Sequence, residues 1–537
     1  MKKTFNYCVA LVSVLFFSSC LKTDNKISSF IESQYSVDEA GAVITVSKNG
    51  EEILNKAIGL ADIEKDISME PKMIFPIASM TKAYTAVAIM QLQENNKLSI
   101  EDDILKYLDG FADEYKQVKI KHLLSNTSGI LSYNRMPEYQ TINNKDTLTL
   151  NSMVGLIKNK PLTFTPHERF SYSNSNYILL TKIIEIVSKH SYQDYIQTNI
   201  LDKANLKHTY FKKLESNLKG YELVNDTIIE NSEDTHHTFG AGMLYASSAD
   251  VIKFLNALNS ELLISKENTD YLYSIPLTHN DGRPDEYASG FWVTKFGQEN
   301  IIKMEGYCAG FYTMAFYIPN QDIAITVFPN SSGYSLPVNQ SFVAEWIYRH
   351  LTNKKAEIYN TIKLNESNLK KFQAVYQIDS LNSRQVFVKD GVLYTLRTGG
   401  QTLKAKPYDE YRFFYPNTFT TFEFIKNNDV FEMVMNDDDS NLSTAVMTEQ
   451  PLREEVKISK NTLKKYVGKY ERGFNIYIEN DDLMFTNGFH SYKLYASSNN
   501  EFFPFHEDSK FVFEEEGTMQ LTYSIGNYTM LVKRIQE

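Results

Sequence analysis

Cysteine is nearly absent from this chain. Cys8, Cys20 and Cys308 are the three cysteines among its 537 residues. A disulfide framework and a zinc site built on cysteine thiolates both need more thiols than these. Long apolar runs are scarce too: beyond a short N-terminal stretch, no segment approaches the about eighteen apolar residues of a membrane-spanning helix. The sequence therefore excludes a disulfide-stabilised scaffold and a cysteine-based zinc protein.

Positive charge is also in short supply. The chain has 55 Lys and Arg against 66 Asp and Glu, which gives a net charge of −11. This balance argues against a nucleic-acid binder and against adhesion to acidic membranes by charge alone. The adjacent pair His236-His237 lacks further ligands at suitable spacing, so we predict no metal site. We also predict no cofactor.

Aromatic residues, by contrast, are abundant. There are 35 Tyr and 33 Phe, and the aromatic fraction of 13% favours substantial β structure. The hydrophobic fraction of 42% and the charged fraction of 23% are typical of soluble globular proteins. Because 537 residues are too many for one hydrophobic core, we expect several domains.

The N-terminus has the pattern of an export signal. Two lysines precede the apolar run Val9–Phe17, and the small pair Ser18-Ser19 follows it. We therefore predict a signal peptide over residues 1–19. Cys20 stands directly after the small pair. This arrangement resembles a bacterial lipobox, in which the cysteine is lipidated and becomes the new N-terminus; an ordinary secretory signal is the alternative.

The residues that follow, 20–30, are polar and are expected to form a tether. With a lipid on Cys20, the membrane would be a partner through this anchor. The protein would then be a lipoprotein of the bacterial cell envelope, periplasmic or in the outer membrane. Under either interpretation of the signal, the chain is exported.

A serine and a lysine three residues apart stand at the start of a strongly apolar helix. Ser79-Met80-Thr81-Lys82 precedes the run Ala83–Leu92, which is apolar nearly all round and predicts a buried helix. At this spacing, Ser79 and Lys82 lie on one helical face. A lysine in a dry site can lose its proton and activate the hydroxyl, and the Ser79 N–H can hold an oxyanion. The pattern predicts a serine acyl-transfer site, although a capping serine beside a solvated lysine has the same sequence.

A polar turn before a second apolar helix offers partners for this pair. Tyr172-Ser173-Asn174 precedes the predicted helix Ile178–Val187. Tyr172 and Asn174 are two residues apart, so in an extended segment their side chains point the same way. A tyrosine hydroxyl beside a lysine can relay a proton, and an asparagine amide can orient a substrate amide. Taken alone, both residues are also typical of an ordinary polar turn.

The order of the predicted elements indicates an α+β domain over residues 31–352. Two alternating runs flank Asn49-Gly50, which is a hairpin signal. Three strand-like runs between Ile301 and Phe328 predict an antiparallel meander, and Ser341–Leu351 predicts a closing helix. Helices around an antiparallel sheet make a layered α+β domain.

The C-terminal part contains an internal repeat. After a polar linker, residues 353–366, the segment Leu369–Tyr376 parallels Leu463–Tyr470, and further paired motifs follow at nearly constant spacing. Each unit consists of short aromatic strands. We therefore predict two small all-β barrel or sandwich modules, at 367–452 and 457–537.

Three motifs together resemble a known family. Ser79-x-x-Lys82, Tyr172-Ser173-Asn174 and the strand that carries Gly306 resemble, in order and approximate spacing, the active-site motifs of the penicillin-recognising serine hydrolases. That family includes class C β-lactamases, D-alanyl-D-alanine carboxypeptidases, D-aminopeptidases and related esterases. The resemblance covers residues 30–350 and implies a β-lactamase/transpeptidase-like fold. The two repeats look like the lipocalin-like modules of some members.

The resemblance also implies roles. Ser79 would be the nucleophile, and Lys82 and Tyr172 would share the general-base and proton-shuttle work. The backbone N–H groups of Ser79 and Tyr307 would form the oxyanion hole, and Asn174 would hold the acyl-side carbonyl. The substrate would be a small-molecule or peptide-like ester or amide.

The third motif departs from the family pattern. Two residues before Gly306, where the family carries Lys or His, this chain has Met304, and Glu305 fills the usual Thr or Ser position. Met304 can neither steady a tyrosinate nor receive a substrate carboxylate, and Lys303 would reach in from a bulged strand. Glu305 would repel a carboxylate and could attract an amine. We therefore expect a serine hydrolase for an ester, or for an amide with a free or basic amine. An inactive binding protein on the same fold and a true β-lactamase or D-alanyl-D-alanine carboxypeptidase are the alternatives.

Overall fold

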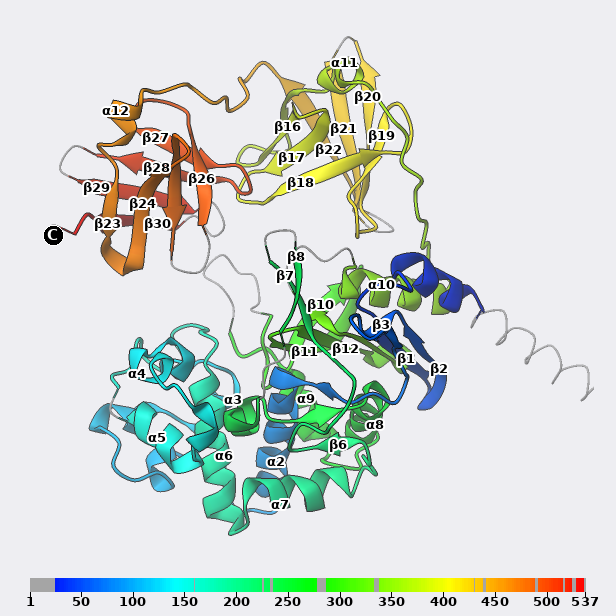
Figure 1. Ribbon diagram of the computed structural model, residues 1–537, viewed down its shortest axis with the longest axis vertical. Coiled ribbons are helices and arrows are strands. Elements are labelled where there is room, and N and C mark those ends of the chain that lie inside the picture. Colours follow the sequence, from blue (N-terminus) through cyan, green and yellow to red (C-terminus); the bar gives the residue numbers. More distant parts are fainter. Residues whose placement is uncertain are drawn as a thin grey trace, which may run out of the picture. The chain divides into compact units, whose positions relative to one another are not determined.

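The computed structural model describes residues 25–535 except 159, 225–226, 232–234, 278–285, 333–337, 429, 438–440, 488–490, 515–516 and 524–527. The predicted signal peptide and Cys20 lie outside the described residues. The chain forms two compact units, Met1–Lys354 and Lys355–Glu537 (Figure 1). Within the described residues, no helix is both long enough and apolar enough to cross a lipid bilayer.

The first unit is built around a six-stranded antiparallel sheet. Its strands, in spatial order, are β10 (Trp292–Phe296), β11 (Glu299–Cys308), β12 (Phe311–Ile318), β13 (Ile323–Pro329), β1 (Ala42–Lys48) and β2 (Glu51–Ile58). The predicted hairpin is confirmed, because Asn49 and Gly50 join β1 to β2 with φ angles of 52° and 76°, the left-handed conformation that a tight turn requires. The predicted meander is confirmed as β11, β12 and β13.

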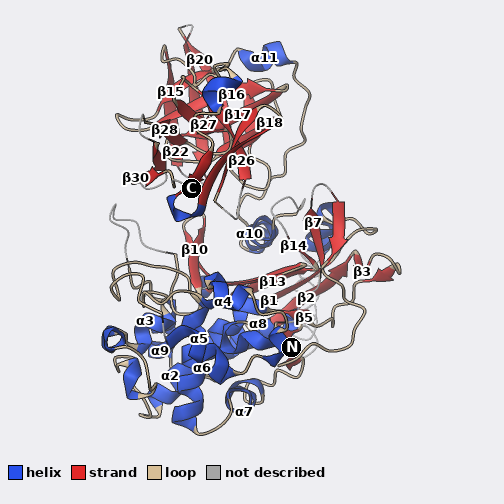
Figure 2. Ribbon diagram, turned by 60° about the vertical axis from the view of Figure 1, so that its left-hand side comes forward, coloured by secondary structure: helices blue, strands red, loops and turns tan. Residues whose placement is uncertain are grey.

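Helices cover both faces of this sheet (Figure 2). The closing helix α10 (Gln340–Leu351) lies on one face, and α2 (Thr81–Glu94) and α8 (Ser248–Asn259) lie on the other. Two neighbouring residues of β12 contact the helices on opposite faces of the sheet. Thr313 contacts Met80, directly before α2, whereas Met314 contacts Ser341 of α10. The predicted α+β architecture is thus confirmed as a three-layer domain.

Helix α2 is the centre of the helical layer. Every residue from Thr81 to Leu92 is buried, so the buried helix predicted from the apolar run is confirmed. The other helices of this layer are α3 (Ile120–Leu124), α4 (Pro137–Gln140), α5 (Leu150–Lys158), α6 (Asn174–Ser188), α7 (Tyr192–Ile196) and α9 (Lys266–Tyr273). Small sheets complete the unit: β3 (Leu60–Asp62) with β4 (Ile67–Ser68); β5 (Phe75–Pro76), β9 (Tyr245–Ala246) and β6 (Thr209–Tyr210); and β14 (Ser331–Ser332), β7 (Tyr221–Val224) and β8 (Thr227–Glu230).

The second unit contains the two β modules predicted from the repeat. The first is a closed barrel of β15 (Ala374–Gln377), β16 (Ser383–Lys389), β17 (Val392–Arg397), β18 (Thr402–Pro407), β19 (Arg412–Phe414), β20 (Thr421–Asn427), β21 (Val430–Asp437) and β22 (Asn441–Thr448). The second is an eight-stranded sheet of β23 (Gly468–Tyr470), β24 (Phe474–Glu479), β25 (Asp482–Thr486), β26 (Ser491–Ala496), β27 (Glu501–Pro504), β28 (Ser509–Phe513), β29 (Thr518–Tyr523) and β30 (Tyr528–Lys533). A short helix precedes each, α11 (Glu366–Lys370) and α12 (Lys460–Leu463).

Sheet and helical layer approach each other closely at one glycine. Strand β11 passes the 3-10 turn η1 (Ala78–Met80) so tightly that a methyl group on Gly306 would lie 2.1 Å from the Ile77 carbonyl oxygen. Such a contact is far inside van der Waals distance. The backbone of β11 can therefore approach η1 because residue 306 has no side chain.

Replacing this glycine should destabilise the first unit. We expect Gly306→Ala to lower its free energy of unfolding by about 1–3 kcal/mol, as overpacked sites do. Gly155→Ala in α5 is the matched control, since nothing lies within 4 Å of a methyl group there. It should be neutral or stabilising by up to about 1 kcal/mol. Denaturant unfolding followed by circular dichroism measures both, and equal effects would contradict the close approach.

Candidate active site

Ser79 and Lys82 meet at the start of α2. Ser79 lies in η1, and Lys82 lies in the first turn of α2, where it is 1% exposed. The Lys82 Nζ is 3.0 Å from the Ser79 Oγ. Ala78, directly before Ser79, has φ 40°, a left-handed conformation that strains a residue with a side chain. Ser79 thus stands on a tight, strained turn beside a buried amine.

Uncharged oxygen atoms surround the Lys82 amine. Its second partner is the Ala241 carbonyl oxygen at 2.7 Å, and within the described residues it forms no ion pair. Burial without a counter-charge lowers the pKa of Lys82 well below its ordinary value. The neutral amine is therefore favoured, and a neutral amine 3.0 Å from a hydroxyl can accept its proton.

The Ala241 carbonyl is held in place by both central helices. In the preceding residue, Gly240, the carbonyl accepts from the Thr85 hydroxyl of α2 (2.7 Å) and the N–H donates to the Thr181 hydroxyl of α6 (3.1 Å). A side chain on Gly240 would collide with Thr181 at 2.3 Å. This glycine turn thereby fixes the second partner of Lys82.

Tyr172 joins the pair from the polar turn before α6. Its phenol lies close enough to the Ser79 side chain to affect the pKa of Tyr172, and the Lys82 Nζ lies 4.9 Å from the centre of its ring. Trp292 stacks on the same ring, with an interplanar angle of 11°. Burial raises the pKa of Tyr172, with a further rise from the nearby Glu305 carboxylate, whereas the Ser79 side chain opposes the change. Tyr172 therefore keeps its proton at neutral pH.

The turn that carries Tyr172 is anchored by Asn126, which the sequence analysis did not assign to the site. The Asn126 side-chain oxygen accepts from the Ser173 N–H (3.1 Å) and from the Asn176 amide (2.9 Å). Asn126 has φ 57°, a conformation that asparagine adopts more readily than most residues. Asn174 is the first residue of α6, so the extended segment ends at Ser173, and α6 begins earlier than the predicted Ile178.

A cavity of about 330 Å³ opens beside Ser79. Asn174 and Tyr307 line it together with Ser79, so three of the expected site residues share one space. Glu222 of β7 lines the cavity as well. Its carboxylate accepts from Asn231 (2.7 Å), from Ser332 (3.1 Å) and from Tyr307 (3.3 Å). In the part of the chain that the structure describes, no cation is paired with Glu222.

The remaining residues of the third motif do not reach this cavity. Met304 is buried in the hydrophobic core of the first unit. Glu305 forms an ion pair with Lys303 (3.1 Å) and accepts from the Tyr312 hydroxyl (3.3 Å). The Lys303 ammonium also lies 5.7 Å from the centre of the Trp292 ring. Met304, Glu305 and Lys303 are absent from the described residues that line the cavity.

Comparisons with known proteins agree with this geometry. The family model described as Beta-lactamase matches residues 27–345. Protein flp of Staphylococcus aureus (strain N315) is 32% identical over 310 residues, which cover 55% of this chain and 61% of that protein. The chain therefore spans less than two thirds of the length of that relative. The teichoic acid D-alanine hydrolase of Staphylococcus aureus is 27% identical over 335 residues, 59% of this chain and 76% of that protein.

A solved structure supports the fold. The octameric penicillin-binding protein homologue from Pyrococcus abyssi superposes with a TM-score of 0.56, over 78% of this chain and 99% of that one, at 24% identity. At this identity the likeness concerns the fold alone. It confirms the β-lactamase/transpeptidase-like domain expected from the three motifs.

The buried amine predicts a specific pH dependence of stability. Below its lowered pKa, Lys82 is charged in both the folded and the unfolded protein. Above it, the folded protein has released a proton that the unfolded chain holds up to about pH 10.4. The free energy of unfolding should therefore rise with pH across this window, by up to about 1.4 kcal/mol per pH unit.

Lys82→Met removes the titrating group and should lack this rise. Urea unfolding of both proteins at a series of pH values up to about pH 9 isolates the effect, since all other ionisable groups are common to the pair. The same pH dependence in both proteins would show that Lys82 is charged in the fold.

Proposed function

This chain belongs to the Beta-lactamase family, and we propose that it is a serine hydrolase that forms an acyl-enzyme on Ser79 with an ester or amide substrate. One observation carries the proposal: the buried Lys82 amine, without an ion-pair partner in the described residues, lies 3.0 Å from the Ser79 hydroxyl. The cavity beside Ser79 supplies room for a substrate.

The reaction begins with proton transfer from Ser79 to Lys82. The Ser79 Oγ attacks the substrate carbonyl carbon, and the negative charge on the carbonyl oxygen is held by the N–H groups of Ser79 and Tyr307. Collapse of this intermediate breaks the bond to the leaving group. The departing alcohol or amine takes a proton from the protonated Lys82 through the Tyr172 phenol. Water then attacks the acyl-enzyme carbonyl carbon and gives a proton to Lys82. Collapse of the second intermediate breaks the bond to the Ser79 Oγ, which takes that proton back from Lys82, and the acid product leaves.

The acceptor in this scheme is Lys82 rather than Tyr172. The direction of both pKa shifts supports the assignment, because burial favours the neutral amine of Lys82 and the neutral phenol of Tyr172. A protonated phenol beside Ser79 is a donor to the leaving group. Asn174, at the cavity wall, is placed to hold the acyl-side carbonyl of the substrate.

We further propose that the substrate carries a free amine. Glu222 presents a carboxylate to the cavity without a paired cation in the described residues, so a substrate ammonium would supply the missing charge. Glu305, to which the sequence analysis gave this role, is already paired with Lys303. One relative is named as a teichoic acid D-alanine hydrolase, and an alanine joined through its carboxyl group keeps its ammonium free.

A substrate carboxylate fits less well. Met304 is uncharged and buried, and Lys303 is engaged by Glu305. These contacts disfavour β-lactam hydrolysis and D-alanyl-D-alanine carboxypeptidase action. They also favour a second candidate, a binding protein without catalysis. We propose that either protein acts in the cell envelope, carried by the export signal and by the predicted lipid on Cys20.

Covalent labelling distinguishes the two candidates. A fluorophosphonate probe should phosphonylate the Ser79 hydroxyl of the native protein, because Lys82 activates that oxygen. Ser79→Ala should take no label, whereas Ser132→Ala, at a serine that holds the backbone of Asn174, should still be labelled. Gel fluorescence and peptide mass spectrometry measure both. Equal labelling of the native protein and Ser79→Ala would contradict the hydrolase proposal.

Glu222 should discriminate among substrates. We expect Glu222→Gln to raise KM for a D-alanyl ester about tenfold or more, the value of one lost charged contact, and to leave KM for the N-acetylated ester unchanged. Glu230→Gln is the control, since that carboxylate pairs with Lys219 outside the cavity. Steady-state kinetics with both esters provide the test. A uniform loss on both esters would argue against ammonium recognition.

A further inference from the structure

The second unit contains a cavity of its own, between its two β modules. It measures about 360 Å³, within the range of small-molecule sites. Backbone hydrogen bonds hold the modules together around it: the Thr402 N–H donates to the His506 carbonyl (2.9 Å), and the Asp508 N–H donates to the Gly400 carbonyl (3.0 Å). The connecting segment adds an ion pair from Arg453 to Asp508 at 2.7 Å. The cavity therefore lies between two modules that are bonded to each other.

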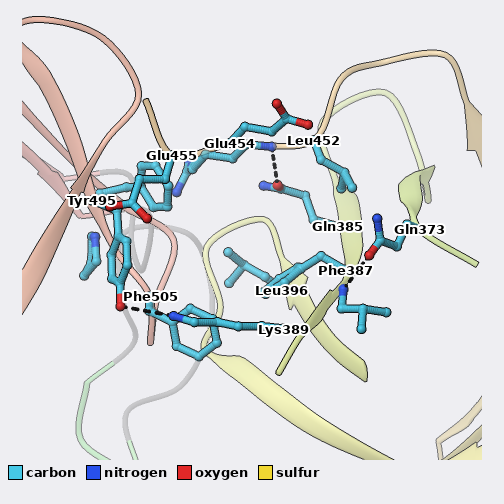
Figure 3. A pocket seen from close by; sticks show the side chains of 14 residues that line it. Gln373, Gln385, Phe387, Lys389, Leu396, Leu452, Glu454, Glu455, Tyr495 and Phe505 are labelled. Atoms are coloured by element: carbon cyan, nitrogen blue, oxygen red, sulfur yellow. Dashed lines mark hydrogen bonds between the residues drawn. The ribbon is translucent and has the colours of Figure 1, made fainter. Parts of the chain in front are cut away.

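Aromatic rings form much of the lining (Figure 3). Phe387 comes from β16 of the first barrel, and Tyr495, Phe503 and Phe505 come from the second module. Phe387 and Phe505 meet edge to face across the junction, with ring centres 5.8 Å apart. Tyr495 stacks on Phe503 at 5.9 Å. Rings from both sides thus offer flat apolar faces to whatever enters.

A lysine from the first barrel lies among these rings. Figure 3 shows Lys389 reaching the hydroxyl of Tyr495, a distance of 3.1 Å. Its ammonium lies 4.2 Å from the centre of the Phe505 ring and 4.6 Å from that of Tyr495. Within the described residues, Lys389 has no carboxylate partner. Its positive charge is held by aromatic faces and one phenol, and is open to an anion.

Arg453 supplies a second positive group. One of its terminal nitrogens pairs with Asp508, whereas the other, Nη1, is buried without a hydrogen-bond partner in the described residues. A buried guanidinium nitrogen without an acceptor is costly. The guanidinium also lies 5.1 Å from the centre of the Phe503 ring. An acceptor oxygen in the cavity would satisfy this nitrogen.

Two glutamines complete the donor set. The side-chain oxygen of Gln373 accepts from the Val388 N–H (3.0 Å), and that of Gln385 accepts from the Arg453 N–H (3.1 Å). Each amide is thereby fixed with its oxygen engaged. Its NH₂ group remains as a donor beside the cavity. Glu454 and Glu455 line the cavity as well, and Glu455 forms an ion pair with Lys493 at 3.5 Å. Lysine, arginine and two amides are the donors that a carboxylate could use.

We propose that this cavity binds a small molecule that joins a ring with an apolar face to a carboxylate. The ring would pack between the aromatic walls, and the carboxylate would accept from Lys389 and from the Arg453 Nη1. Aromatic acids and sugar acids share this chemistry, because a sugar ring also packs on aromatic faces. The site is separate from the Ser79 cavity, and its occupancy does not depend on catalysis.

Ligand binding to the full chain tests the proposal. The probes are 2-naphthoate, D-glucuronate and the uncharged methyl 2-naphthoate, titrated by calorimetry and by saturation-transfer NMR. We expect saturable one-to-one binding of at least one acid and weaker binding of the ester. Lys389→Met should weaken acid binding about tenfold or more. Lys404→Met, an exposed lysine of the same barrel outside the cavity, should leave it unchanged.

Phe505→Leu tests the aromatic wall without changing any charge. It removes one aromatic ring from the lining and should weaken the binding of whichever acid binds. Its melting temperature should be similar to those of Lys389→Met and Lys404→Met. Binding of naphthoate alone identifies an aromatic acid, and binding of glucuronate alone identifies a sugar acid. No saturable binding of either acid, or equal affinity in Lys389→Met and the native chain, overturns the proposal. Ser79→Ala should bind the acid as tightly as the native chain does. Binding at this cavity can therefore be measured even if the proposed hydrolase activity is not found.

Discussion

A buried lysine amine without a counter-ion is the constraint on which this structure depends. Moving an ammonium from water into a protein interior is expensive, and the usual remedies are an ion pair or loss of the proton. Lys82 has a carbonyl and a hydroxyl as its partners, so the neutral amine is favoured. The fold therefore holds a base in place. Any carboxylate near Lys82 would restore its charge and remove that property.

Several distant segments cooperate to keep this amine dry and aligned. The Ala241 carbonyl is presented by a glycine turn tied to α2 and α6, and α2 is buried along its apolar length. On the other side, β11 approaches η1 because Gly306 lacks a side chain. Sheet and helical layer thus close on the strained turn that carries Ser79. The architecture matters to function chiefly through these close contacts.

Much of this could be predicted from the sequence. Ser79 and Lys82 are three residues apart, and helical geometry alone places them together. Tyr172 and Asn174 were found because a polar turn before an apolar helix is a local pattern. The repeat predicted both β modules for the same reason: periodic apolar positions are visible in one dimension.

The unpredicted parts arise from long-range contacts. Asn126 reaches Ser173, and Ala241 reaches Lys82, across large separations in the chain. Glu222 belongs to a short strand with no motif around it. The ion pair of Glu305, however, could have been predicted from the sequence, because Lys303 lies two residues away on the same face of a strand. The cavity between the modules depends on how the two modules pack against each other. Neither repeat taken alone predicts this packing.

The same logic separates the two cavities chemically. The first presents an unpaired carboxylate, Glu222, beside a nucleophile. The second presents Lys389 and Arg453 among aromatic rings and no nucleophile with a base.

The most direct test of the central claim is rapid-quench mass spectrometry with p-nitrophenyl acetate. We expect the peptide containing Ser79 to gain the mass of one acetyl group transiently. That adduct should decay in water, and at neutral pH it should not form in Lys82→Met. Release of p-nitrophenol without this adduct, or acetylation of Lys82→Met at the native rate, would contradict the assignment of Ser79 as nucleophile and Lys82 as its base.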